Sequence, residues 1–276
     1  MKFGVTLVHD ADVRAIVELG CLAEEAGWDG VFVWDGIDGN DVWVTLAAIA
    51  ARTERVKLAT MLTPLSRRRP WKLAQETATL DKLSGGRVIL PVGLGAPETG
   101  FAKYGEEVDR KRRAELLDEG LAVLNGLWSG GPFSFEGEHF RLDDVTYSPS
   151  PCQRPRIPVW VVGAWPRPKS MRRVVQWDGL IPYKLDGTDD PTTPDDIRAM
   201  KAWIDARRTA TTPFDIVWED DTPGDDPAAP AEIVQPWADA GVTWWLESVW
   251  NAPRTAAGIA GMRERIAAGP PRVGDR

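Results

Sequence analysis

The stretch "LDKLSGGRVILPVGLGAP", residues 80–97, places two pairs of glycines around one apolar run. Gly85 and Gly86 precede the run, and Gly93 and Gly95 stand near its end. Glycines in this number are typical of phosphate-cradling loops, of dinucleotide-binding turns and of the two ends of a buried strand. Which of the three applies depends on what surrounds the stretch along the chain.

On both sides of this stretch, short apolar runs alternate with longer segments whose apolar residues have helical spacing. The apolar runs predict strands at 2–8, 30–34, 56–62, 87–95, 158–164, 179–185, 214–218 and 242–247. The helical segments that follow them lie at 11–27, 41–54, 70–86, 109–128, 168–177, 193–208, 227–241 and 255–269. The strand runs lack a clean polar alternation, which suits a parallel sheet covered on both faces.

Eight strand–helix units in 276 residues predict an α/β fold, a (β/α)8 TIM barrel. The turn-rich stretch 129–157 is expected to form an excursion between the fourth helix and the fifth strand. The segment 220–230, "DDTPGDDPAAP", is expected to be a surface loop within a strand–helix connection. We find no sign of a second core, so residues 1–276 are predicted to form a single domain.

The main rival fold is a doubly wound sheet that binds a dinucleotide. That fold requires G-x-G-x-x-G after its first strand, whereas Gly93 and Gly95 follow the fourth predicted strand and lack the third glycine. A Walker phosphate loop is absent as well. Gly85 and Gly86 are therefore interpreted as the end of a helix, and the later pair as a strand end where backbone either approaches a ligand closely or eases crowding.

Composition excludes several classes of function. The formal net charge of -8 argues against a nucleic-acid or anionic-membrane partner, because both require a basic face. The longest apolar runs are too short to span a membrane, and the N-terminus does not resemble a signal peptide. Two cysteines in unrelated contexts fit a reducing compartment, so we expect a cytoplasmic protein. Only two histidines are present, so no metal site is predicted.

In a barrel of this type, function lies at the C-terminal ends of the strands. The residues expected there are aromatic side chains, glycines and scattered carboxylates, with few bases. A glycosidase would need two facing carboxylates, and Asp35, Glu219 and Glu247 offer a pair; the alternative is a solvated rim or a salt bridge to Lys184. A wide apolar mouth also suits a flat cofactor that carries the chemistry itself.

Two blocks give the chain a more specific likeness. "TLDKLSGGR" (79–87) and "PSPCQRPRIPVWVVG" (149–163), together with "RRAELLDEGLAVLNGLW" (112–128), resemble the luciferase-like flavin-dependent monooxygenase family. The resemblance implies a TIM barrel with an excursion, often a dimer, that binds reduced FMN or the deazaflavin F420. It also implies a cis peptide bond near the end of the third strand.

Carried over by position, the resemblance implies a set of site residues. Asp35 would edge the ring or substrate pocket and is the first candidate for a catalytic group, followed by His9. Arg113 would pair with the cofactor phosphate. The remaining residues expected to bind the cofactor are Gly36, Met61, Leu62, Thr63, Pro91, Leu94, Gly163, Ala164, Trp165 and Ser170. Three departures from the family pattern are Gly36 where a histidine is common, Pro91, and "GAWP" at 163–166.

The chain carries 14 tryptophans, several of them near strand ends, which suggests an apolar or aromatic substrate. Trp34, Trp218 and Glu247 are the residues expected to contact it, and Trp250 is a further candidate. The sequence thus predicts an FMNH2-using monooxygenase acting on a small organic substrate. The alternatives are an F420-dependent reductase or dehydrogenase, and a flavin-binding barrel without catalysis. The expected partners are the substrate, a second copy of the chain and a separate flavin reductase.

Overall fold

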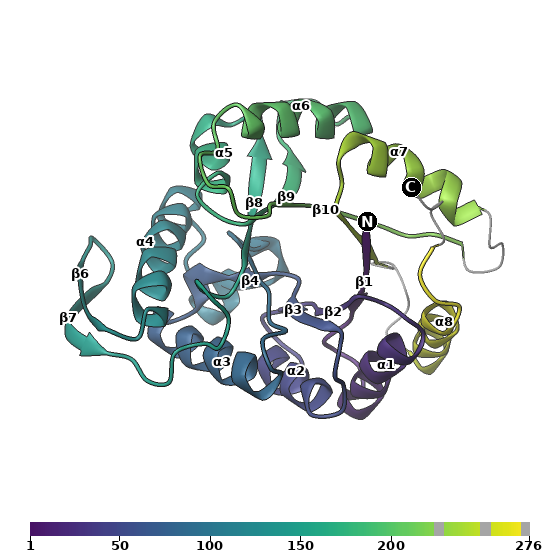
Figure 1. The fold of residues 1–276 in the computed structure, drawn as a ribbon, viewed down its shortest axis with the longest axis horizontal. Helices are drawn as coiled ribbons and strands as arrows, with labels where there is room; N and C mark the ends of the chain where they lie inside the picture. The colour runs from purple at the N-terminus through teal and green to yellow at the C-terminus, as the bar shows by residue number, and fades with distance from the viewer. Residues whose placement is uncertain (224–228, 249–254, 272–276) are drawn as a thin grey trace.

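A computed structural model describes residues 1–223, 229–248 and 255–271. Trp250 and residues 224–228 of the predicted surface loop lie outside the described residues. The chain forms a parallel barrel surrounded by helices, with the first strand beside the last (Figure 1). The predicted TIM barrel is confirmed.

The barrel strands follow the predicted runs closely. Their bounds are β1 Lys2–Leu7, β2 Gly30–Val33, β3 Lys57–Thr60, β4 Thr63–Pro64, β5 Leu90–Gly93, β8 Val159–Trp165, β9 Gly179–Lys184, β10 Asp215–Asp220 and β11 Trp244–Glu247. The helices outside them are α1 Val13–Glu25, α2 Val42–Ala50, α3 Pro70–Leu83, α4 Arg110–Trp128, α5 Pro168–Val174, α6 Pro194–Asp205, α7 Ala229–Ala240 and α8 Ala256–Ala267. Three short 3-10 helices also occur, at Leu65–Arg67, Pro97–Thr99 and Phe101–Tyr104.

The third predicted strand, 56–62, contains β3 and the link to β4, a two-residue strand that lies just beyond the predicted range. β3 pairs with β2, and β4 pairs with β5, so the barrel closes through the chain segment that links the two halves. The peptide bond between Met61 and Leu62 in this segment is cis, as the family resemblance implies. Apolar runs do not indicate β4, because it consists of Thr63 and Pro64 alone.

Local signals explain where the helices begin and end. Asp12 and Asp41 accept hydrogen bonds from the first free N–H groups of α1 and α2, which stabilises those helix starts. Pro70 stands at the start of α3, where its missing N–H costs nothing. Gly85 and Gly86 follow α3 with φ of +67° and +87°, which confirms the predicted helix end.

The barrel interior is filled by aromatic side chains. Phe32, Trp160 and Trp244 lie with ring centroids 5.4 to 5.8 Å apart. Successive strand residues point to opposite faces, so Trp244 lies inside the barrel while its neighbour Trp245 packs in the layer between strands and helices. This packed interior closes the barrel below its mouth.

The N-terminal end of the barrel is held by buried polar groups. The Asp81 carboxylate accepts hydrogen bonds from Cys152 N at 2.8 Å, Gln153 N at 3.1 Å and Gln153 Nε2 at 2.7 Å. The Arg87 guanidinium donates to the carbonyls of Ala50 and Thr53 at 3.0 and 2.8 Å. The two sequence blocks that carry the family resemblance therefore contact each other at this end.

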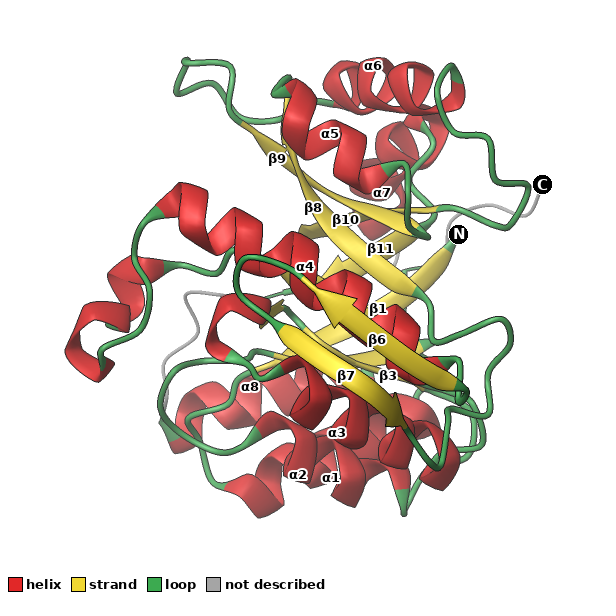
Figure 2. Cartoon of the chain, turned by 90° about the vertical axis from the view of Figure 1, so that its left-hand side faces the viewer, coloured by secondary structure: helices red, strands yellow, loops and turns green. Residues whose placement is uncertain are grey.

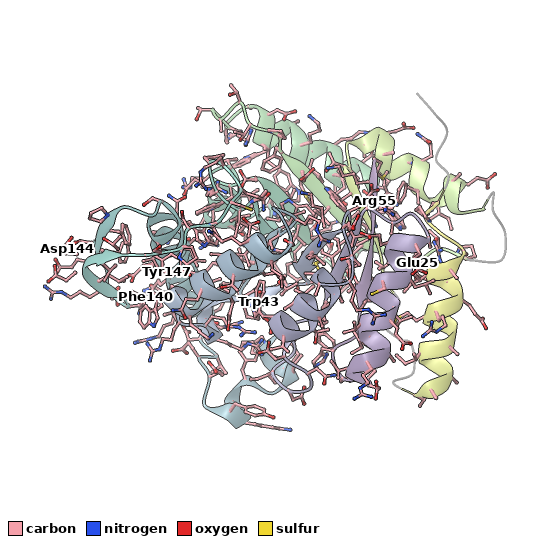
Figure 3. The ribbon with its side chains drawn as sticks, turned by 60° about the horizontal axis from the view of Figure 1, so that its bottom comes forward. Glu25, Trp43, Arg55, Phe140, Asp144 and Tyr147 are labelled. Carbon is pink, nitrogen blue, oxygen red and sulfur yellow. The ribbon has the colours of Figure 1, made fainter. Side chains whose placement is uncertain are left out.

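The excursion is an antiparallel hairpin of β6 Pro132–Glu136 and β7 Arg141–Thr146. It lies against the outside of α4 (Figure 2), and Figure 3 shows Asp144 at its outer end. Glu119 of α4 fixes the turn, because its carboxylate accepts the backbone N–H groups of Glu138, His139 and Phe140 at 2.7 to 3.0 Å. In the part of the chain that the structure describes, no helix is both long and apolar enough to span a membrane.

Candidate active site

The C-terminal ends of the strands open into a cavity of about 1330 Å³. Met61, Leu62 and Ile181 form apolar parts of its lining, and Trp34 and Tyr183 line it at the ends of β2 and β9. Pockets for a single drug-sized ligand are typically 300 to 1,000 Å³ in volume. This cavity therefore has room for a cofactor and a small substrate together.

The loop after β5 forms part of the cavity, as the opening stretch of sequence suggested. Gly93 and Leu94 line it, and a Cβ atom at Gly93 would lie 2.9 Å from Val162 and 3.0 Å from Leu62. On the other side, Ala164 and Ser170 also line the cavity, and Ala164 N donates to Ser170 Oγ at 2.9 Å. The glycines thus mark a strand end at a ligand-sized cavity rather than a phosphate loop.

Cationic side chains line one flank of the cavity, where the first turns of α4 and α5 meet. Arg173 pairs with Asp118 at 2.8 Å, and Lys111 lies 3.5 Å from Glu115. Among the described residues, five lining cations have no ion-pair partner: the buried Arg113, and Arg110, Arg167, Lys169 and Arg172 at the surface. These four are exposed to solvent and give this flank a local excess of positive charge.

Arg113 is buried in the wall beneath that flank and is 5% exposed. Its Nη1 donates to the carbonyls of Leu94 and Gly95 at 2.8 and 3.2 Å. Its Nε has no hydrogen-bond partner among the described residues. Burial lowers the pKa of this guanidinium. Arg113 therefore holds the loop after β5 and keeps unused donor capacity beside the cavity.

Asp35 lines the cavity, but its carboxylate is already engaged. Arg68 Nη2 donates to both Asp35 oxygens, at 2.7 and 2.8 Å, and Arg67 Nη2 donates to Oδ1 at 2.8 Å. Burial raises the pKa of Asp35, and the guanidinium groups of Arg68 and Arg67 oppose that rise. The predicted catalytic role stays a prediction, and the observed contacts describe a clamp between the loops after β2 and β4.

His9 is buried directly behind Gly36 and does not line the cavity. Its Nε2 lies 3.4 Å from Asp38 Oδ1, its Nδ1 has no hydrogen-bond partner among the described residues, and its ring meets Trp34 edge-on at 4.7 Å. A Cβ atom at Gly36 would lie 2.0 Å from His9 Nε2. The imidazole thus fills the space that a side chain at position 36 would need, so the glycine and His9 depend on each other.

Strand alternation explains which predicted residues are absent from the cavity. Trp218 points outward and stacks on Trp237 of α7 with centroids 3.9 Å apart. Glu247 also points outward, where Arg265 of α8 lies 3.2 Å away. The predicted substrate contacts of Trp218 and Glu247 are not supported by this geometry, because side chains at these positions face the helices.

Four further residues predicted to bind the cofactor do not line the cavity. Gly163 and Trp165 lie on the outward face of β8, where a Cβ atom at Gly163 would approach Met171 Sδ at 2.9 Å. Pro91 is buried in β5, and Thr63 is fully buried with its hydroxyl 2.8 Å from that of Thr60. The predicted residues that the structure does bring to the cavity are Trp34, Asp35, Gly36, Met61, Leu62, Leu94, Arg113, Ala164 and Ser170.

Glu219, which the sequence offered only as a member of a possible glycosidase pair, lines the cavity. Its Oε1 accepts hydrogen bonds from Thr6 Oγ1 at 3.1 Å and from Ser248 Oγ. Burial raises its pKa to about 7, and the two hydroxyl hydrogen bonds act in the opposite direction. The alternation of side chains along β10 could have indicated this position. Val217 faces the barrel interior, and Glu219, two positions further on, lies on the same face.

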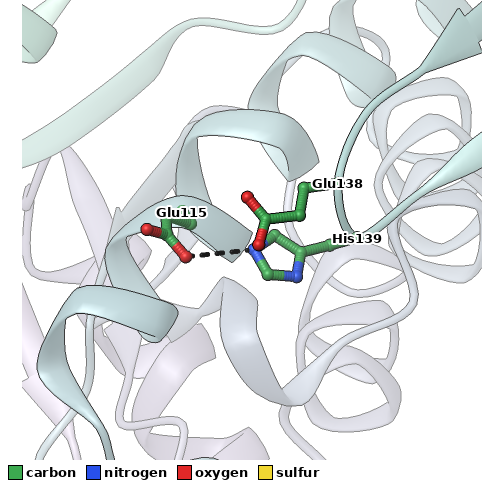
Figure 4. A group of neighbouring side chains, drawn as sticks. All are labelled: Glu115, Glu138 and His139. Atoms are coloured by element: carbon green, nitrogen blue, oxygen red, sulfur yellow. Dashed lines mark hydrogen bonds and ion pairs between the residues drawn. The ribbon is translucent and has the colours of Figure 1, made fainter.

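A separate group of possible metal ligands lies where the turn of the hairpin meets α4 (Figure 4). Glu115, Glu138 and His139 each place one ligand atom within 4.8 Å of the others. His139 Nε2 lies 3.3 Å from Glu115 Oε2, and this contact gives the group a structural purpose without an ion. It ties the hairpin turn to α4.

The barrel and its cofactor-sized cavity at the C-terminal face define a class of proteins that binds ligands between strand-end loops. The luciferase-like monooxygenase family matches residues 1–209. The chain belongs to this family.

Individual relatives differ in the cofactor that they use. An F420-dependent glucose-6-phosphate dehydrogenase of Microbacterium testaceum is 34% identical over 160 residues, covering 55% of this chain and 47% of that protein. An FMNH2-dependent dimethylsulfone monooxygenase of Pseudomonas putida is 31% identical over 173 residues, covering 60% and 46%. The chain spans about half the length of these curated relatives.

Among solved structures, the F420-dependent tetrahydromethanopterin reductase of Methanopyrus kandleri superposes with a TM-score of 0.76. The superposition covers 97% of this chain and 98% of the reductase at 18% sequence identity. At that identity the similarity concerns the fold.

Proposed function

We propose that this protein is an oxidoreductase that binds the deazaflavin F420 at the barrel mouth and transfers hydride between it and a small organic substrate. The observation that carries the proposal is the row of unpaired cations along the cavity, at Arg110, Arg167, Lys169 and Arg172. A single phosphate, as in FMN, needs one or two such groups. The longer acidic tail of F420 uses more of them.

The other cavity residues fit a flat ring system. Met61, Leu62 and Gly93 offer apolar surface and close backbone approach beneath it, and Arg113 has a free Nε for a phosphate oxygen. F420, when bound, would supply the hydride acceptor or donor. The protein's own contribution is to orient the two reactants, to exclude water from the apolar floor and to move the accompanying proton.

Reduced FMN and a monooxygenase reaction form the second candidate, which the relative from Pseudomonas putida supports. In that case O2 would be the co-substrate, and a separate flavin reductase would supply the reduced cofactor. Far fewer of the flank cations would be needed, because the tail of FMN ends in one phosphate. The two candidates therefore predict different effects of removing those cations.

The deciding experiment is a fluorescence titration of the protein with F420 and with FMN, each oxidised and reduced. We expect Lys169→Ala combined with Arg172→Ala to weaken F420 binding about tenfold, or about 1.4 kcal/mol, and to reduce its salt dependence. FMN binding should change by less than twofold. Tight FMN binding and no F420 binding by the unaltered protein would overturn the F420 proposal.

The matched control removes two cations of the same kind from α6, Arg198→Ala combined with Lys201→Ala. Both side chains lie on the surface in pairs with Asp195 and Asp205 of their own helix and away from the cavity. Because the change in net charge is the same, this variant separates a local tail site from a general electrostatic attraction. Equal weakening in both double variants would count against a tail site on α5.

A further inference from the structure

Glu219 is a carboxyl group that the barrel holds at the cavity by one of its two oxygens. Thr6 of β1 and the residue after β11, Ser248, both donate to Oε1. Oε2 has no hydrogen-bond partner among the described residues, and the side chain lines the cavity. One oxygen is therefore fixed and the other is available to a ligand.

We propose that Glu219 is the proton-transfer residue of this site, accepting the hydroxyl proton of an alcohol substrate and returning it to the carbonyl in the reverse reaction. This inference rests on the proposed hydride-transfer function and names the chemical class of its substrate. It extends the site to β10, from which the family resemblance carried over no residue.

The other carboxyl groups that line the cavity are less suited to this task. Both oxygens of Asp35 accept hydrogen bonds from Arg68. Asp109 caps the start of α4, and Asp118 pairs with Arg173. Glu115 is engaged with Lys111 and His139, and Glu98 is exposed at the rim.

The surroundings of Glu219 support a group that changes its protonation state near neutral pH. Hydroxyl groups face it from β1 and from the end of β11, and Tyr183 of β9 lines the same cavity. Asp220 is the charged neighbour on its own strand. Burial outweighs the hydroxyl hydrogen bonds and raises the pKa to about 7, where a general base is most effective at physiological pH.

The proposed step conserves atoms and charge. With the deazaflavin bound as the oxidant, the C–H bond of the alcohol would break and its electron pair would leave with the hydrogen as hydride. The O–H bond breaks and its proton goes to Glu219 Oε2, while the carbon and oxygen form a carbonyl. The proton then leaves for solvent through the cavity mouth.

The test compares the unaltered protein with Glu219→Gln, which keeps the shape of the side chain and removes the base. F420 loss is followed with propan-2-ol, cyclohexanol and glucose 6-phosphate as probes, and F420 binding is titrated separately. We expect turnover to fall by 10²-fold or more, with F420 affinity unchanged within twofold. Glu136→Gln, an exposed carboxyl on the hairpin, is the matched control and should behave as the unaltered protein.

Two readouts separate proton transfer from a structural role. Ser248→Ala removes a donor to the carboxylate, so the acid limb of the pH–rate profile should move to higher pH. Infrared difference spectra between pH 5 and pH 9 should contain a protonated-carboxyl band with a midpoint near the pKa of about 7, which Glu219→Gln removes. That measurement needs neither substrate nor cofactor.

The outcomes are distinguishable. Absence of F420 binding would reject the proposed function, whatever Glu219 does. F420 binding with no oxidation of any probe alcohol and no reduction of the matching carbonyls would overturn the substrate class. Normal turnover in Glu219→Gln, or an unmoved profile in Ser248→Ala, would remove Glu219 from the proton path.

Discussion

The two ends of the barrel use buried polar groups in opposite ways. At the N-terminal end, the Asp81 carboxylate accepts three N–H donors and Arg87 donates to backbone and side-chain oxygens around it. At the C-terminal end, Arg113 Nε and Glu219 Oε2 belong to side chains that line the cavity, and neither atom has a hydrogen-bond partner among the described residues. The buried polar groups at the N-terminal end are satisfied by contacts within the fold, whereas some of those at the C-terminal end remain able to bind a ligand.

This difference explains what a family likeness can report. The sequence blocks around residues 79–87 and 149–163 are joined to each other at the N-terminal end, so they specify the barrel. The groups that would select cofactor and substrate stand at the opposite end, on α4, α5 and β10. Similarity in the blocks at 79–87 and 149–163 therefore indicates the fold, but it does not indicate which cofactor or substrate is bound.

The strongest test of the comparison is Arg87→Met. The substitution leaves the buried oxygens of Ala50, Thr53 and Val56 without their donor. We expect the free energy of unfolding to fall by about 4 kcal/mol, since each orphaned group costs about 1 to 3 kcal/mol. Urea denaturation measures it, with Arg14→Met at an exposed position of α1 as the control. A loss below 1 kcal/mol would mean that this end is not held as described.

Asp35→Asn tests a fully engaged carboxylate at the mouth. The change removes the counter-charge that the guanidinium groups of Arg67 and Arg68 share, so the expected loss of stability is about 3 kcal/mol. Asp41→Asn, which removes a neighbouring charge while an asparagine can still cap α2, is the control. Thermal unfolding and limited proteolysis of the loop at residues 65–69 provide the measurements. Full stability with lost turnover would instead support the catalytic role that the sequence suggested.

Glu219 gives a more specific effect, a dependence of stability on pH. Its pKa is about 7 in the folded chain and near 4.5 when unfolded, so between these values the unfolded chain releases a proton that the folded chain retains. Stability from this group is therefore lost as pH rises from 4.5 to 7, by about 3 kcal/mol in total. Relative to the unaltered protein, Glu219→Gln should gain stability at pH 8 and none at pH 4.

Equal effects of Glu219→Gln at pH 4 and pH 8 would show that the carboxyl titrates normally. In that case burial would not disfavour the ionised form of Glu219, and only the cations at the C-terminal end would distinguish it from the N-terminal end. The same denaturation series on Glu136→Gln corrects for any general effect of removing a negative charge.

Much of the fold could be predicted from the sequence, because short apolar runs, helical patterns, and glycine and proline signals locate all eight strand–helix units. The separate strand β4 could not, because it is only two residues long and lies just beyond the apolar run 56–62. At the site, Trp34 and Met61 line the cavity because they continue the inward-facing positions of Phe32 and Ala59. Trp218 and Glu247 were predicted to contact substrate, but side chains at a strand end alternate between two faces. Only after Val217 and Leu246 are known to point into the barrel does the alternation place Trp218 and Glu247 on the outward face.

The pairing of Asp35 with Arg67 and Arg68 was beyond sequence reasoning for another reason. The three residues come from loops after two different strand segments, and only the closed barrel brings them within 2.8 Å. The cations of α4 and α5 meet in the same way. Contacts between strand-end loops depend on the ring as a whole, whereas strands and helices are specified locally.

The break between β3 and β4 also bears on whether a strand of another chain could pair with the edge of the sheet. In hydrogen-bonding terms the sheet has two edges, β3 and β4, and a single covalent link joins them. β4 is two residues long, and a lone bridge between Leu58 and Val88 spans the gap below it. Edges this short and this close together offer no template on which a strand of another chain could pair. The link between β3 and β4, which contributes Met61 and Leu62 to the cavity, therefore also disfavours aggregation through the sheet edge.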